Sequence, residues 1–153
     1  MYITDEQILQ YKEDGFLIIE NFLTENERRS ALDGFYKHFA PPYHRYIEAN
    51  RKNETAKEVL FPWDHSGLNH VTTHPDLVDA AERVLETREI RLGEGHLGIK
   101  YAWEEHWTNF HIDYGNNTLV PIIQPDDFKH LACFYCFEDV TLELAPIRMV
   151  RNG

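Results

Sequence analysis

The sequence predicts an α+β protein in which N-terminal helices flank a β-rich core. Helix-start signals and apolar residues at helical spacing occupy residues 1–86, whereas short apolar runs of strand character dominate residues 87–150. Helices followed by strands, rather than alternating with them, are typical of α+β architectures. A length of 153 residues suits one compact unit, so we predict a single domain over residues 1–153.

Three helices are predicted in the first part of the chain. The first begins at a capping box over residues 4–7, in which a threonine hydroxyl and a glutamine side chain satisfy backbone amides, and ends at Gly15. A second capping box over residues 24–27 opens a helix that stops before the proline pair at 41–42. The third begins near Pro75, because proline suits the first turn of a helix.

Strands are predicted where apolar, β-branched or aromatic runs are bounded by turn residues. These runs are residues 16–20, 89–92, 96–101, 107–113, 118–123 and 129–140.

The two cysteines, Cys133 and Cys136, form a C-x-x-C pattern inside the last predicted strand. Side chains three positions apart on a strand point to opposite faces, so the two sulfur atoms diverge. We therefore predict two small buried residues in a reducing compartment, in preference to a disulfide or a shared metal.

The composition excludes several classes of protein. A content of 42% apolar and 13% aromatic residues excludes a disordered acidic tail. The 26 acidic against 15 basic residues give a net charge of −11, which disfavours nucleic-acid and anionic-membrane partners. No apolar run approaches the length of a membrane span, and the acidic start over residues 1–6 is unlike a signal peptide. We predict a soluble, cytoplasmic protein.

The most informative chemical pattern is His111-Ile112-Asp113. On a strand, two residues at this spacing project from the same face about 6.5–7 Å apart, so an imidazole and a carboxylate can converge on one metal. A second histidine would complete the 2-His-1-carboxylate triad that leaves positions on Fe(II) open for a cosubstrate and O₂. The alternative is a hydrogen-bonded surface pair. A second H-x-D, residues 74–76, lies at a predicted helix start and is interpreted as structural.

Three blocks of the sequence, in this order, resemble the phytanoyl-CoA dioxygenase family. Residues 4–23 resemble the N-terminal signature of that family, and residues 111–119 (HIDYGNNTL) resemble its H-x-D segment. Residues 138–150 are similar to the strand and turn where these proteins usually read DV…GP…V. Together the blocks span nearly the whole chain.

The resemblance implies a double-stranded β-helix (jelly-roll) core, Fe(II), and 2-oxoglutarate as cosubstrate. The implied reaction hydroxylates a C–H bond of a small organic substrate and is coupled to oxidative decarboxylation. His111 and Asp113 match the first two iron ligands. Lys100 is a candidate partner for a 2-oxoglutarate carboxylate, or else a solvated edge-strand lysine. Asn116 and Thr118 are candidate hydrogen-bond donors to the cosubstrate, or else parts of a plain turn.

The sequence also departs from the family pattern. The second histidine ligand and the arginine that binds 2-oxoglutarate lie in the family beyond the GP…V turn, and Ala145 stands where the family has glycine. We therefore expect the front part of a C-terminally truncated domain, with five of the eight strands of a jelly roll and exposed sheet edges that favour self-association. The alternative function is a non-catalytic fragment that acts as a metal-binding or partner-binding module.

Two further histidines, His65 and His70, fall in a predicted loop after Trp63. They are either contributors to substrate binding from a lid loop or solvated loop side chains.

Overall fold

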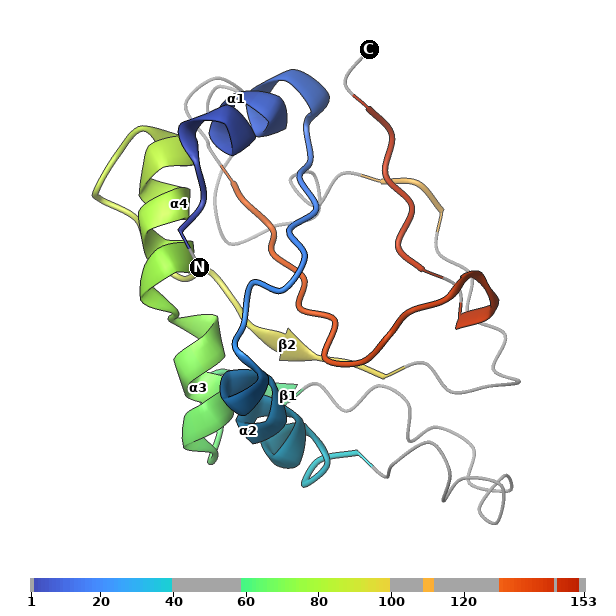
Figure 1. Ribbon diagram of the computed structural model, residues 1–153. Helices are drawn as coiled ribbons and strands as arrows, with labels where there is room; N and C mark the ends of the chain where they lie inside the picture. The colour runs from blue at the N-terminus through green and yellow to red at the C-terminus, as the bar shows by residue number, and fades with distance from the viewer. Residues whose placement is uncertain (1, 40–58, 100–108, 112–129, 145, 152–153) are drawn as a thin grey trace.

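Four α-helices and one short strand pair form the described part of the chain (Figure 1). The computed structural model describes residues 2–39, 59–99, 109–111, 130–144 and 146–151. The elements are α1 (Asp5–Asp14), α2 (Glu25–Phe35), β1 (Val59–Leu60), α3 (Ser66–Thr72), α4 (Pro75–Leu85), β2 (His96–Leu97) and a 3-10 turn at Leu142–Leu144.

Both predicted capping boxes are confirmed. The Thr4 hydroxyl accepts from the Gln7 amide at 3.3 Å, and the Gln7 side chain accepts from the Thr4 amide at 2.9 Å. Thr24 and Glu27 make the same reciprocal pair at the start of α2, at 3.3 and 2.8 Å. Gly15 ends α1 with φ of 82°, a left-handed conformation that glycine adopts without a steric penalty.

The third predicted helix, α4, begins at Pro75 as expected, but α3 occupies residues where we predicted a loop. The sequence of α3 gives a weak helix signal because it is short and contains Gly67 and β-branched residues. Tertiary packing stabilises it instead, since Leu68 and Val71 are buried against α2. A Cβ atom on Gly67 would lie 2.3 Å from the Ser30 hydroxyl oxygen, so the close approach of α3 to α2 requires glycine here.

The helices pack in two pairs, α2 with α3 and α1 with α4 (Figure 1). Leu97 of β2 joins the larger core between α2 and α3, so the strand pair lies against the same cluster. The smaller core lies between the N-terminal segment, α1 and α4. The larger cluster consists of Ala31, Phe35, Phe39, Trp63, Leu68, Val71 and Leu97, and the smaller one of Ile3, Ile8 and Ala80.

The prediction of a jelly-roll core is wrong for the residues that the structure describes. Their only sheet is the antiparallel pair of β1 and β2, in which Val59 lies opposite Leu97 and Leu60 opposite His96. Residues 16–20, 89–92 and 130–140 contain no strand in the structure. Residues 109–111, the described part of the predicted strand 107–113, also contain no strand, and within 96–101 the only described strand is β2. Residues 118–123 lie outside the described residues.

Residues 130–140 show why the strand prediction fails. Tyr135 and Phe137 turn inward and contact Phe22 and Phe35 at ring-centroid distances of 6.0 and 6.3 Å. By contrast, Phe134 before them is 60% exposed, and Cys136 between them is also exposed. This alternation is the period of a strand, yet a strand also requires a hydrogen-bonded partner, and this segment pairs with no other described strand. The apolar pattern indicates which side chains pack inward. It does not indicate whether the backbone forms hydrogen bonds with a neighbouring strand.

Cys133 and Cys136 are free and exposed, so the prediction that both are buried is wrong. Among the described residues this segment has no sheet neighbours, and only its inward side chains contact the helices, so the two cysteines stay exposed.

Candidate functional site

Of the predicted metal-binding and cosubstrate-binding residues, His111 alone falls within the described part of the chain. It lies exposed in the short segment 109–111. The other predicted residues, Asp113, Lys100, Asn116 and Thr118, lie outside the described residues.

The hydrogen bond of His111 defines which ring nitrogen carries the proton. Nδ1 lies 2.8 Å from the backbone carbonyl oxygen of Asn109. A carbonyl oxygen can only accept, so Nδ1 carries the hydrogen, and in the neutral ring the lone pair is on Nε2. Histidines that bind metals characteristically donate their other ring N–H to a backbone carbonyl or a carboxylate. His111 therefore fits the requirements of an Nε2 metal ligand.

A second group of metal-ligand side chains, Glu27, His70 and His74, was not predicted as a site. These residues come from α2, α3 and the N-cap of α4, and one ligand atom from each lies within 4.8 Å of the others. Glu27 Oε1 is 2.9 Å from His70 Nε2 and 3.3 Å from His74 Nε2. Two histidines and a carboxylate are the donor set of many Fe(II) sites. The hydrogen bonds of the three residues decide whether this group could bind a metal.

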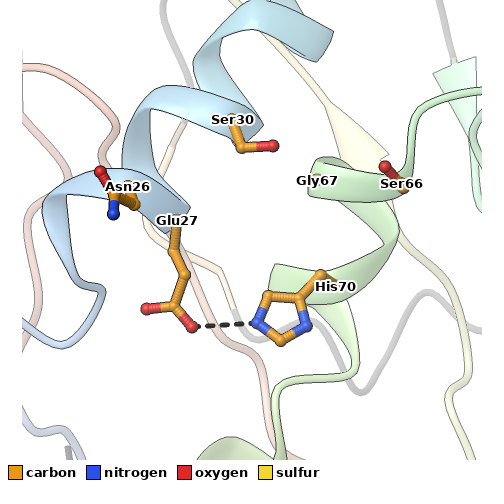
Figure 2. Close-up of a pocket in the computed structure, with 6 residues that line it drawn as sticks. All are labelled: Asn26, Glu27, Ser30, Ser66, Gly67 and His70. Atoms are coloured by element: carbon orange, nitrogen blue, oxygen red, sulfur yellow. Dashed lines mark hydrogen bonds and ion pairs between the residues drawn. The ribbon is translucent and has the colours of Figure 1, made fainter.

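Figure 2 shows Glu27 and His70 facing each other across the opening between α2 and α3. This opening is a hollow of about 310 Å³. Its lining is Asn26, Glu27, Ser30, Ser66, Gly67 and His70.

The hydrogen bonds of His74 do not fit a metal ligand. His74 Nδ1 accepts from the backbone N–H of Asp76 at 3.1 Å, which caps α4. The neutral ring then carries its hydrogen on Nε2, the atom that faces Glu27. If Nε2 bound a metal, the neutral ring would carry its hydrogen on Nδ1. That hydrogen would point at the Asp76 N–H, and the hydrogen bond that caps α4 would be lost. The starts of α2 and α4 both meet here, and helix N-termini favour anions over cations. We therefore assign this group to helix packing.

Glu27 is the centre of this structural network. Its Oε2 atom accepts from the Thr24 amide at 2.8 Å and from the Thr24 hydroxyl at 2.7 Å, while Oε1 faces the two histidines. The hydrogen bonds from Thr24 and then His70 lower the pKa of Glu27 to about 2. One carboxylate thus joins the start of α2 to the end of α3 and the start of α4.

Aromatic side chains pack against the buried side of the network formed by Glu27, His70 and His74. The Phe22 ring meets the His74 ring edge-on at 5.0 Å, and Tyr135 lies beside Phe22. Burial raises the pKa of Tyr135, so its hydroxyl stays neutral close to the Glu27 carboxylate. His74 itself is only 7% exposed, so its ring depends on Glu27 and Asp76 for hydrogen bonds.

The prediction that His65 and His70 both lie in a loop is wrong for His70, which lies within α3 and contacts Glu27. His65 lies outside the helix, as the N-cap of α3. The capping box containing Glu27 and the spacing of His70 and His74 are visible in the sequence. Their convergence is not, because it depends on how α3 packs on α2.

Acid is expected to destabilise the protein through Glu27. Its pKa in the folded state is about 2, below the ordinary value of 4.5. A carboxyl group with a depressed pKa contributes stability above its unfolded-state pKa and loses it as the pH falls towards the folded-state pKa. We expect the free energy of unfolding to fall between about pH 4.5 and pH 2, measured by urea titration at several pH values.

The matched control is Glu25, two positions earlier on α2. Hydrogen bonds from Arg28 and Arg29 lower its pKa to about 2 as well, but its side chain is 52% exposed, against 24% for Glu27, so salt screens its charge more strongly. Measurements at high salt therefore suppress the contribution of Glu25. At high salt, Glu27→Gln should make the free energy of unfolding less dependent on pH in this range, and Glu25→Gln should not. If the free energy of unfolding fell as steeply with acid in Glu27→Gln as in the wild type, Glu27 would not be the source of the acid sensitivity.

Comparison with known proteins gives no relative. No family, no curated protein and no solved structure matches the chain. Among the described helices, none is both long and apolar enough to cross a membrane. The assignment of function therefore depends on the residues of the chain itself.

Proposed function

We propose that this chain is a cytoplasmic Fe(II)- and 2-oxoglutarate-dependent dioxygenase of the phytanoyl-CoA dioxygenase type that hydroxylates a small organic substrate. The observation that carries the proposal is the hydrogen bond from His111 Nδ1 to the Asn109 carbonyl, which puts the hydrogen on Nδ1 and the lone pair on Nε2, the atom that would bind the metal. Its support from the sequence is the H-x-D pattern at 111–113 within three ordered blocks that resemble the family. The proposal concerns these donor residues and does not include a jelly-roll core.

In this proposal each site residue has a defined task. His111 and Asp113 would hold the iron, which when bound supplies O₂ activation. Lys100 would neutralise a carboxylate of 2-oxoglutarate, and Asn116 and Thr118 would donate hydrogen bonds to it. One oxygen atom of O₂ enters succinate as CO₂ leaves 2-oxoglutarate, and the other enters the C–H bond. Two of the four electrons come from 2-oxoglutarate and two from the substrate.

A specific observation favours a second candidate function, that of a partner-binding module. Large apolar side chains are exposed along residues 134–150, which is typical of surfaces that associate. The exposed side chains are Phe134, Val140, Leu142, Leu144, Ile147, Met149 and Val150. Self-association would appear as a concentration-dependent mass in analytical ultracentrifugation.

The dioxygenase proposal is tested by the formation of succinate. The protein is incubated with Fe(II), 2-oxoglutarate, O₂ and ascorbate, which supplies the two electrons when no substrate is present. We expect succinate from the wild type and a decrease of at least about 10-fold in His111→Ala, because loss of a ligand costs no less than loss of the groups that orient it.

His70→Ala is the control, since it removes an exposed histidine from the structural network and should retain succinate formation. Failure of the wild type to form succinate, or equal rates in wild type and His111→Ala, would overturn the proposed function.

A further inference from the structure

The ring of Phe110, next to His111, contacts Arg148 in the C-terminal part of the chain. Figure 1 shows residues 146–151, in red, passing beside the short amber segment 109–111. The guanidinium carbon of Arg148 lies 5.1 Å from the centroid of the Phe110 ring. This distance is within the range of a cation–π interaction, for which arginine is the more common partner.

Phe110 stands between the two residues that share the hydrogen bond of the proposed metal ligand. Asn109 supplies the carbonyl oxygen and His111 the Nδ1–H, so the backbone of Phe110 joins donor to acceptor. The Phe110 ring is 63% exposed, so core packing constrains it weakly. A contact that fixes this ring therefore restrains the backbone on which the hydrogen bond depends.

We propose that Arg148 is a positioning residue for His111. By holding the Phe110 ring, it keeps residues 109–111 in the conformation that maintains the Nδ1–H form of His111. This inference rests on the proposed function, because it assigns Arg148 a role at the same metal site.

Electrostatics alone predicts the opposite effect of Arg148 on metal binding. A positive charge near a cation site repels the cation, so removing that charge should tighten binding. Removing a positioning contact should weaken it. The sign of the change in affinity therefore distinguishes the two roles.

Arg151 provides a matched control on the same segment. Its guanidinium pairs with Asp14 at 2.9 Å, and the Asp14 side chain is only 11% exposed. Arg151→Gln removes one positive charge from residues 146–151, as Arg148→Gln does, but leaves the Phe110 contact in place. It should lower the unfolding temperature without changing the tautomer of His111.

The test combines two measurements on the full chain. Long-range ¹H–¹⁵N NMR of the metal-free protein reports which nitrogen of His111 carries the hydrogen, and calorimetry with Co(II) reports metal affinity. Arg148→Gln should reduce the Nδ1–H population and weaken Co(II) binding about 2- to 5-fold, the effect of an exposed cation–π contact. Arg148→Lys should retain most of the Nδ1–H population and most of the Co(II) affinity, since lysine also binds aromatic faces.

An unchanged tautomer in Arg148→Gln, or tighter Co(II) binding, would overturn the inference. Absence of Co(II) binding through His111 in the wild type would instead overturn the proposed function. In that case a tautomer shift confined to Arg148→Gln would still support the positioning role.

Discussion

Replacing Leu68 by alanine is expected to lower the free energy of unfolding by about 2–5 kcal/mol. Leu68 is fully buried in α3 and belongs to the core that joins α3 to α2. Truncation removes buried apolar surface and leaves a cavity that a tightly packed helix pair can only partly fill. Since small proteins are stable by about 5–15 kcal/mol, this single change removes a large share of the total.

Urea denaturation followed by far-UV circular dichroism measures this loss. Leu9→Ala is the matched control, because Leu9 lies on α1 with 65% of its surface exposed and should change stability by less than about 0.5 kcal/mol. A Leu68→Ala protein with the same midpoint and slope as the wild type would show that α3 does not pack on α2 as described.

Replacing Glu27 by alanine is expected to cost about 2–4 kcal/mol. The change removes the capping box at the start of α2 and leaves the Nε2–H of buried His74 without its carboxylate. A buried donor that loses its acceptor bears the full cost of desolvation. Glu27→Gln should cost less, because the amide oxygen can still accept one of these hydrogen bonds.

Glu25→Ala is the control for this prediction. It removes a carboxylate from the same turn of α2, but the ion pairs of Glu25 with Arg28 and Arg29 are exposed and contribute little. The same urea titration compares the two variants. Equal losses in Glu25→Ala and Glu27→Ala would contradict the assignment of Glu27 as the centre of the network.

The features predicted correctly from the sequence are local ones. The capping boxes at Thr4 and Thr24, the stop at Gly15 and the start at Pro75 each depend on residues within one helical turn. The residues that form each signal are neighbours in the sequence, so a single sequence is sufficient to predict them.

The features missed depend on partners distant in the chain. Helix α3 is stabilised by contacts of Leu68 and Val71 with α2, and its own helix propensity is weak. The network of Glu27 with His70 and His74 requires α2, α3 and α4 to meet. Likewise, residues 130–140 have the side-chain alternation of a strand but do not pair with any described strand. The local sequence pattern does not indicate whether such a pairing strand exists.

The candidate metal site stays a prediction from the sequence. The H-x-D spacing selects His111 and Asp113 as candidate ligands, of which only His111 lies in the described part of the chain. The protonated nitrogen of His111 and that of His74 became visible only through their hydrogen bonds, to a carbonyl in one case and from an amide in the other. That difference in tautomer separates the proposed metal ligand, His111, from the helix-capping His74.

The most direct test of the central claim, that His111 and not the Glu27 group binds the metal, is a calorimetric titration with Co(II). We expect one site in the wild type, loss of binding in His111→Ala and in Asp113→Ala, and retained binding in His70→Ala. Binding that is lost in His70→Ala and retained in His111→Ala would contradict the claim and move the metal to the network between α2, α3 and α4.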